Sequence, residues 1–146
     1  MKKMAIVISV IVALLLTVVV FVIISFSKVE KVESLKTLSF SYTNGSSYLS
    51  DVSYTMECED ECHVFIKPMG VKDEDAEEVA VDSLSYKKII DVLNEYQVVK
   101  WNGFHGTNMN VLDGDSFTFS FTGNDDLQVS ASGYMNYPKN YYEVSS

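Results

Sequence analysis

The pattern of hydrophobic and polar positions divides the chain into a continuous apolar run and a longer alternating region. Residues 4–26 are apolar except for Ser9, Thr17 and Ser25. As a helix with a rise of about 1.5 Å per residue, this run extends roughly 34 Å, which exceeds the hydrocarbon core of a bilayer at about 30 Å. The pattern therefore predicts a transmembrane helix or an unusually long signal peptide.

The flanking charges bear on the orientation of this run. Lys2 and Lys3 precede it, which is the layout of a secretory signal whose N-terminus stays in the cytoplasm. Lysine number alone does not decide the orientation, because three lysines follow the run: Lys28, Lys31 and Lys36. We expect export of the C-terminal part, since the short basic tail is a poor candidate for translocation. The run lacks an Ala-x-Ala ending, so we expect a retained signal anchor over residues 1–27; secretion after cleavage at Ser27 is the alternative.

Beyond the apolar run, the sequence predicts a short stalk and one domain. Residues 28–37 are polar, without Gly or Pro, and are interpreted as a juxtamembrane stalk. Residues 38–146 have the size of one extracytoplasmic domain. The domain opens with Leu38, Phe40 and Tyr42, which alternate with Ser and Thr as in a half-buried strand.

Two further strands are expected after the first. Asn44-Gly45 predicts a type I′ hairpin turn, with the return strand starting near Tyr48. A bulge near Ser50-Asp51 would place the following alternate residues on the core face: Val52, Tyr54, Met56 and Cys58. A third strand is predicted from Cys62 to about Lys67, where Pro68 ends it.

The middle of the chain predicts one helix. Residues 71–78 form an acidic stretch, interpreted as a solvated loop or an irregular helical turn, because it lacks the D-x-[DN]-x-[DN]-G order of a calcium loop. The helix is expected from Ser83 to Tyr96, with Asp82 or Ser83 as its N-cap. One apolar stripe would face a sheet: Tyr86, Ile89, Ile90, Leu93 and Tyr96.

A hairpin completes the predicted fold. Phe117, Phe119 and Phe121 alternate with Ser and Thr, residues 123–126 have turn composition, and an alternating strand returns from Leu127. The order of elements is βββ-α-ββ. We therefore expect an α+β domain with two layers, in which one helix packs on an antiparallel sheet of about five strands.

Cys58 and Cys62 are the only cysteines of the chain. They flank a turn-prone acidic triplet between two expected strands, where their side chains can face one another. Outside the cytoplasm this arrangement predicts a disulfide. A metal site formed by Cys58, Cys62 and His63 is the alternative, on a weak ligand pattern.

The charge of the chain argues against nucleic acid as a partner. Nine of the 11 lysines and all 20 Asp and Glu follow residue 27, so this part carries a formal charge of −11. Such a surface repels phosphate backbones. The sequence contains no arginine, so bidentate recognition of a phosphate or carboxylate by that side chain is absent. We expect no metal or cofactor.

Two segments rich in aromatic residues and glycine are candidates for a binding surface. One is residues 101–106 and the other is residues 132–142. Loops concentrate function, and Trp and Tyr favour binding. The candidate binding residues are Trp101, Phe104, His105, Tyr134, Tyr137 and Tyr141. The other interpretation is that Trp101 and Phe104 pack at the edge of the core, and both interpretations can hold together.

Four short motifs carry a resemblance to a known family. They are W-N-G-F at 101–104, V-L-D-G-D-S-F at 111–117, S-A-S-G at 130–133 and P-K-N-Y at 138–141. The set resembles small exported domains of Gram-positive gut bacteria that have no assigned function, chiefly over residues 84–144. The resemblance implies a bacterial surface or secreted context and a compact α+β domain. It implies no catalytic residues, and this chain differs from relatives that carry a lipid-attached cysteine in place of the helix.

The sequence leaves two classes of function open. The first is a membrane-anchored extracytoplasmic module that binds a protein or small ligand, or serves as an accessory of the cell envelope. The second is a small hydrolase-type enzyme that uses His105 with Asp113 and Asp115. The chain lacks a G-x-S-x-G elbow and a phosphate-binding glycine loop. We expect the binding module, and the enzyme would require that His105 and the two carboxylates converge.

Overall fold

The computed structural model describes Thr17, residues 30–46 and residues 51–146. The expected membrane anchor therefore lies outside the described residues except for Thr17, which is helical. The chain divides into two compact units, Met1–Glu30 and Lys31–Ser146. Among the described residues, no helix is both long enough and apolar enough to cross a membrane.

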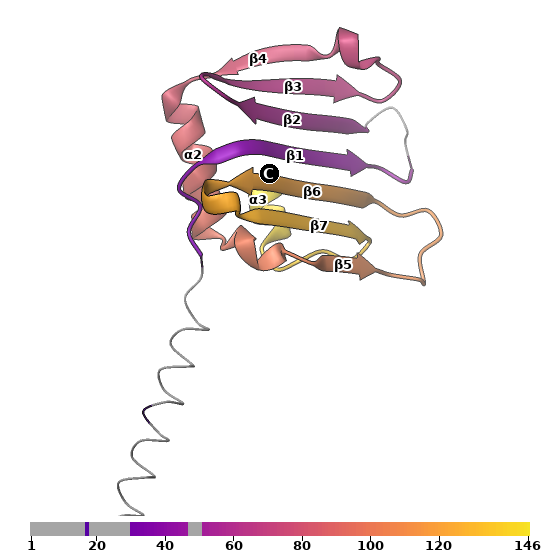
Figure 1. Cartoon of the computed structure of the whole chain (residues 1–146). Helices are drawn as coiled ribbons and strands as arrows, with labels where there is room; N and C mark the ends of the chain where they lie inside the picture. Colours follow the sequence, from indigo (N-terminus) through magenta and orange to yellow (C-terminus); the bar gives the residue numbers. More distant parts are fainter. Residues whose placement is uncertain (1–16, 18–29, 47–50) are drawn as a thin grey trace, which may run out of the picture. The chain divides into compact units, whose positions relative to one another are not determined.

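The C-terminal unit is built on one mixed sheet (Figure 1). Within the described residues it has seven strands in the order β4-β3-β2-β1-β6-β7-β5. The strands are β1 (Leu35–Thr43), β2 (Val52–Cys58), β3 (Cys62–Pro68), β4 (Glu77–Val81), β5 (Phe104–Thr107), β6 (Ser116–Gly123) and β7 (Gln128–Tyr134). Neighbouring strands are antiparallel except for β5, which pairs in parallel with β7. The predicted α+β class is confirmed.

Alternation along β1, β2 and β6 gives the sheet one apolar face and one largely polar face. Phe40 of β1 lies opposite Tyr54 of β2 and Phe119 of β6, so three aromatic side chains form a row on the apolar face. The polar face carries hydroxyl pairs between neighbouring strands, including Ser41–Thr118 and Thr37–Thr122, each at 2.7 Å between oxygens. The helices α2 (Ser83–Glu95) and α3 (Tyr141–Ser145) pack on the apolar face, which leaves the hydroxyl-rich face uncovered (Figure 1).

The sequence did not predict two of the strands, β4 and β5, and each omission has a physical reason. β4 includes Glu77 and Glu78, which the sequence placed in an acidic loop. As an edge strand it needs only one paired side, so exposed charges are compatible with it. β5 has four residues and was assigned to a loop. Its parallel pairing with β7 joins segments distant in sequence, which local alternation cannot reveal.

The predicted type I′ turn at Asn44-Gly45 is wrong. Tyr42 pairs with Val52, so the connection between β1 and β2 is much longer than two residues. Neither Asn44 nor Gly45 has the positive φ that this turn requires. Gly45 is needed for a different reason, since a Cβ there would lie 2.5 Å from the carbonyl oxygen of Gly114. The predicted start of the return strand at Tyr48 lies outside the described residues.

The main helix is as predicted. α2 spans Ser83–Glu95, and Asp82 is its N-cap, with a side-chain oxygen 2.8 Å from the backbone nitrogen of Ser85. Its apolar stripe packs on the sheet, with Leu93 fully buried and four others partly buried against the core: Tyr86, Ile89, Ile90 and Tyr96. A short helix, α3 (Tyr141–Ser145), packs on the same face near β6 and β7.

The segment expected to be a stalk contributes to the domain. The compact unit begins at Lys31, and β1 begins at Leu35, before the predicted strand start at Leu38. Val32 and Leu35 are buried in the core. The side chain of Asn124, in the turn between β6 and β7, accepts a hydrogen bond from the backbone N–H of Glu33 at 2.8 Å. The sequence did not predict that Val32 and Leu35 belong to the core, because the residues around them are polar.

Candidate functional site

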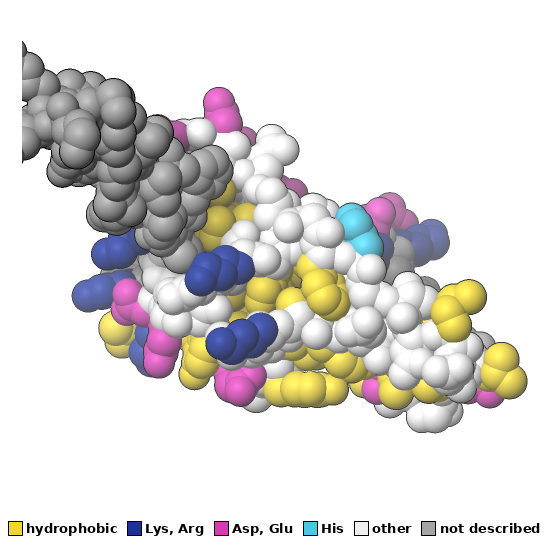
Figure 2. Space-filling view, turned by 90° about the horizontal axis from the view of Figure 1, so that it is seen from below, with side chains coloured by type: hydrophobic (Ala, Val, Ile, Leu, Met, Phe, Trp, Pro, Cys, Tyr) yellow, Lys and Arg dark blue, Asp and Glu magenta, His cyan; other side chains and the backbone are white. Residues whose placement is uncertain are grey.

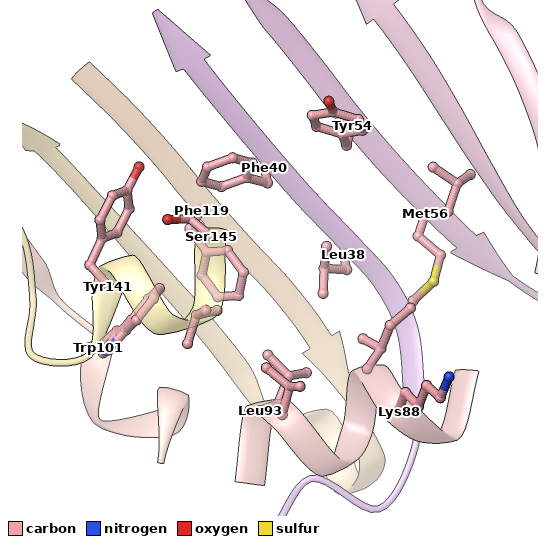
Figure 3. Close-up of a pocket in the computed structure, with 14 residues that line it drawn as sticks. Leu38, Phe40, Tyr54, Met56, Lys88, Leu93, Trp101, Phe119, Tyr141 and Ser145 are labelled. Atoms are coloured by element: carbon pink, nitrogen blue, oxygen red, sulfur yellow. The ribbon is translucent and has the colours of Figure 1, made fainter. Parts of the chain in front are cut away.

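An apolar cavity lies on the helix side of the sheet (Figure 3). Its volume is about 430 Å³, which falls in the range of small-molecule sites. The sheet contributes Leu38, Phe40, Tyr54, Met56, Val64 and Phe119. The helices and the turn η3 (Val98–Trp101) contribute Lys88, Ile89, Val92, Leu93, Trp101, Tyr141, Val144 and Ser145.

The cavity exists because the helices cover only part of the sheet. A helix with its side chains is about 10 Å wide, whereas strands of seven to nine residues such as β1 and β2 are about 23–30 Å long. α2 packs across one end of the strands and α3 packs near β6. Between them, Phe40 and Tyr54 of β1 and β2 form an aromatic floor, with their ring centroids 6.5 Å apart. Tyr54 is 39% exposed, so the cavity reaches solvent there.

Trp101 forms one end of the cavity and is held rigidly. Its side chain is only 3% exposed, and its Nε1–H donates to the carbonyl oxygen of Lys139 at 2.9 Å. Its ring meets Phe119 edge-on at 5.3 Å between centroids and tilts against Tyr141 at 6.1 Å. Trp101 is thus both a core residue and part of the cavity wall, so the two interpretations of this residue are compatible.

Tyr141 and Tyr137 form a stacked aromatic pair beside this wall. Their centroids are 4.6 Å apart, and the ring of Tyr141 is 4.5 Å from that of Phe117. Burial raises the pKa of Tyr141 well above its usual value, and neighbouring tyrosines add to the effect. Burial also raises the pKa of Tyr137. Both rings are therefore neutral near pH 7. Of the pair, Tyr141 lines the cavity.

The other candidate residues lie elsewhere. Phe104 packs against the core from the edge strand β5. His105 is exposed, with its Nδ1 2.9 Å from the Oγ of Ser132. Tyr134 fixes the loop before β6, because its hydroxyl accepts from the N–H of Gly114 at 2.9 Å and lies 2.8 Å from the carbonyl oxygen of Leu112. The structure therefore brings together only Trp101 and Tyr141 of the six candidates at the cavity.

The proposed enzyme residues are separated. His105 lies on the polar face of the sheet beside Ser132. Asp115 accepts a hydrogen bond at 2.7 Å from the hydroxyl of Tyr42, which lies opposite the buried Phe117 on the helix side. Asp113 is exposed in the loop before β6. His105 and Asp115 thus interact with opposite sides of the sheet.

Cys58 and Cys62 form the predicted disulfide. They face each other in the register of β2 and β3, at the point where the hairpin turns. The paired thiols cannot act as thiolate ligands, and no group of three or more His, Cys, Asp or Glu in the described part of the chain could hold a metal ion. Nearby, the Nδ1 of His63 lies 2.8 Å from Glu78 on the polar face.

Hydrophobic side chains also reach the surface away from the cavity. Figure 2 shows them in a broken strip among polar groups, with lysines beside them, when the domain is seen from its β5 side. Two of the most exposed are Met109 and Leu112, in the loop between β5 and β6. These residues stand apart from the aromatic floor and do not line the cavity.

Sequence reasoning missed most of the cavity floor and Lys88. The sequence correctly assigned four floor residues to the core face of their strands, namely Leu38, Phe40, Tyr54 and Met56. The alternation of side chains does not show what covers that face. A useful signal was the single predicted main helix, because one helix about 10 Å wide cannot cover the full length of the strands. Comparisons with protein-family models, curated proteins and solved structures find no match. The resemblance to exported domains stays a prediction.

Proposed function

We propose that this chain is a membrane-anchored extracytoplasmic binding module whose cavity takes an apolar ligand. The observation that carries the proposal is a cavity of about 430 Å³ in which an aromatic floor reaches solvent. Ligand pockets are typically open clefts of a few hundred Å³ with a mostly apolar and aromatic lining. The size and the lining of this cavity therefore favour a ligand.

The extracytoplasmic location is supported by two independent features. The apolar run at residues 4–26 has the length of a membrane span. The disulfide between Cys58 and Cys62 is of the kind that persists in oxidising compartments outside the cytoplasm. Together they favour a domain that is tethered to the cell membrane and faces the envelope.

The cavity favours binding over catalysis. Apart from Lys88, its lining has no charged side chain. Tyr141 at its wall offers no general base near neutral pH, because burial raises its pKa and keeps it neutral. The alternative of a hydrolase with His105, Asp113 and Asp115 has no comparable support, since His105 and Asp115 interact with opposite sides of the sheet.

Trp101 supplies a direct test, because it is the single tryptophan of the chain and lines the cavity. The full chain is reconstituted into phosphatidylcholine vesicles and titrated with dodecanol brominated at its terminal carbon, a neutral contact quencher of tryptophan. We expect saturable quenching of Trp101. Quenching no greater than that of a tryptophan peptide free in the same vesicle suspension would refute the proposal.

A pair of variants locates the binding. Tyr54→Ser removes an aromatic ring from the floor, and Tyr142→Ser removes an exposed ring of α3 that does not line the cavity. We expect the first to raise the half-saturating concentration of the probe by roughly fivefold or more, since it removes apolar contact area. The second should leave it unchanged. Equal effects would place the probe outside the cavity, and thermal unfolding verifies that both variants fold.

A further inference from the structure

We infer that the ligand of this cavity is a single-chain amphiphile with an anionic carboxylate head, held by the ammonium group of Lys88 with its apolar chain directed toward Trp101. The inference rests on the proposed function and adds the chemical class and the orientation of the ligand. It depends on where the one charged group of the cavity lies.

The cavity has a charged end and an aromatic end. Figure 3 shows Lys88 beside Met56 at one end, and Trp101 with Tyr141 at the other. Between them the lining is apolar, from Leu38 on the strand side to Leu93 on the helix side. A ligand that fills this space therefore needs an elongated apolar body and a group at one end that tolerates a cation.

The charge of Lys88 is not neutralised by a close carboxylate. Among the residues that the structure describes, no carboxylate oxygen lies within 4.0 Å of its Nζ, whereas three of the seven other described lysines form such pairs, namely Lys36, Lys67 and Lys72. Asp82 is close enough to feel the charge of Lys88. Its oxygens, however, accept hydrogen bonds from the backbone and side chain of Ser85 at 2.8 and 3.2 Å, as the cap of α2.

The position of Lys88 indicates the charge of the ligand, because this cation lines the cavity of a chain that is acidic as a whole. The chain carries 20 acidic residues against 11 lysines, yet no carboxylate lines the cavity and one lysine does. A cationic ligand would be repelled there, and a neutral one would gain nothing from the charge. An anionic head gains a charge-assisted hydrogen bond, while its chain gains about fourfold in affinity for each methylene that is removed from water.

The first experiment compares head groups on one chain length. The full chain in phosphatidylcholine vesicles is titrated with dodecanoate and with dodecanol, both brominated at the terminal carbon, and quenching of Trp101 is followed. We expect dodecanoate to bind roughly five- to tenfold more tightly. Dodecanoate brominated next to its carboxylate should quench Trp101 much less than the terminally brominated acid, because its bromine would lie at the Lys88 end.

A matched pair of variants tests the role of Lys88. Lys88→Gln and Lys87→Gln remove the same charge from adjacent positions of α2, and Lys87 does not line the cavity. We expect Lys88→Gln to abolish the preference for dodecanoate over dodecanol and to leave dodecanol binding unchanged. Lys87→Gln should retain the preference. Because the lipid is the same for every variant, partition of the probes into the vesicles cancels in the comparison.

Each other outcome has a distinct meaning. If dodecanoate and dodecanol bind equally and both variants behave as the parent chain, the inference about the head group is wrong and the proposed apolar site stands. If neither compound quenches Trp101, the proposed function itself fails. If phosphatidylglycerol in the vesicles displaces the brominated dodecanoate in a manner that depends on Lys88, the anionic head belongs to a membrane lipid, which overturns the assignment of a single-chain ligand.

Discussion

Asn94 binds the main chain of Val32 through both halves of its side-chain amide. Its Oδ1 accepts from the N–H of Val32 at 2.9 Å, and its Nδ2 donates to the carbonyl oxygen of Val32 at 2.8 Å. The same Nδ2 lies 3.0 Å from the carbonyl oxygen of Ile90. The side chain of Asn94 thus makes the two hydrogen bonds that a paired strand would make to Val32. These bonds attach the segment before β1 to α2.

Asn94→Ala should therefore weaken the start of the domain. It would leave the N–H and carbonyl of the buried Val32 without their partner, at a cost of about 2 kcal/mol in the free energy of unfolding. Urea denaturation followed by circular dichroism measures this. Asn136→Ala, at an exposed position, is the control and should change the free energy by less than about 0.5 kcal/mol. Equal stability of the two variants would contradict the role of Asn94.

Trp101→Ala should destabilise the domain strongly. The substitution removes a buried ring that contacts Phe119 and Tyr141, and it leaves the carbonyl oxygen of Lys139 without its donor. We expect a loss of about 3–5 kcal/mol, the usual range for a buried tryptophan. Circular dichroism follows the unfolding, because the fluorophore is lost. Trp101→Phe retains most of the ring volume and should lose clearly less; unchanged thermal unfolding of Trp101→Ala would refute the packing role.

Tyr42 should give the domain a defined alkaline pH dependence. Its pKa is raised from 10.0 to about 12, first by the hydrogen bond to Asp115 and then by burial and the charge of that carboxylate. The neutral hydroxyl is favoured in the folded state, so its contribution to stability is full below pH 10 and is lost as the pH rises through about 12.

The measurement for Tyr42 is urea unfolding at several alkaline pH values. The difference in stability between the parent chain and Tyr42→Phe should be constant near neutral pH and shrink above about pH 10. A difference that stays constant up to about pH 12 would show that the bond to Asp115 does not hold the proton.

Removal of the disulfide should cost a modest amount of stability. Cys58 and Cys62 are separated by 4 positions, so the closed loop is short and the chain-entropy model gives about 2 kcal/mol. We expect Cys58→Ser with Cys62→Ser to fold with a free energy of unfolding lower by that amount. Reduction of the parent chain should have an equal effect. A loss above about 4 kcal/mol would mean that the hairpin tip is needed for folding.

The same cysteines report the compartment of the domain. In intact cells, a membrane-impermeant maleimide should label Cys58 and Cys62 only after treatment with a reducing agent, because the thiols are paired in the disulfide. This result would place the domain outside the cytoplasm. Labelling that requires cell lysis would place it inside and would contradict the proposed location.

The sequence determined those parts of the fold that short-range patterns encode. The spacing of Tyr86, Ile89 and Leu93 defined α2 and its buried stripe, and Asp82 marked its start. Alternation around Phe119 defined β6 and its core face. The cysteine spacing predicted the disulfide. In each case the signal lies within one helix turn, one strand or one hairpin, where side-chain direction follows directly from the backbone repeat.

The tertiary structure alone decided the candidate site. β5 forms through parallel pairing with β7. Tyr54 and Lys88 line the same cavity, although Tyr54 belongs to a strand and Lys88 to a helix. Alternation states which face of a strand is apolar, but not how much of that face a helix covers. The cavity arises because α2 crosses the strands at one end and leaves part of their apolar face uncovered, and this placement exists only once the helix has packed on the sheet.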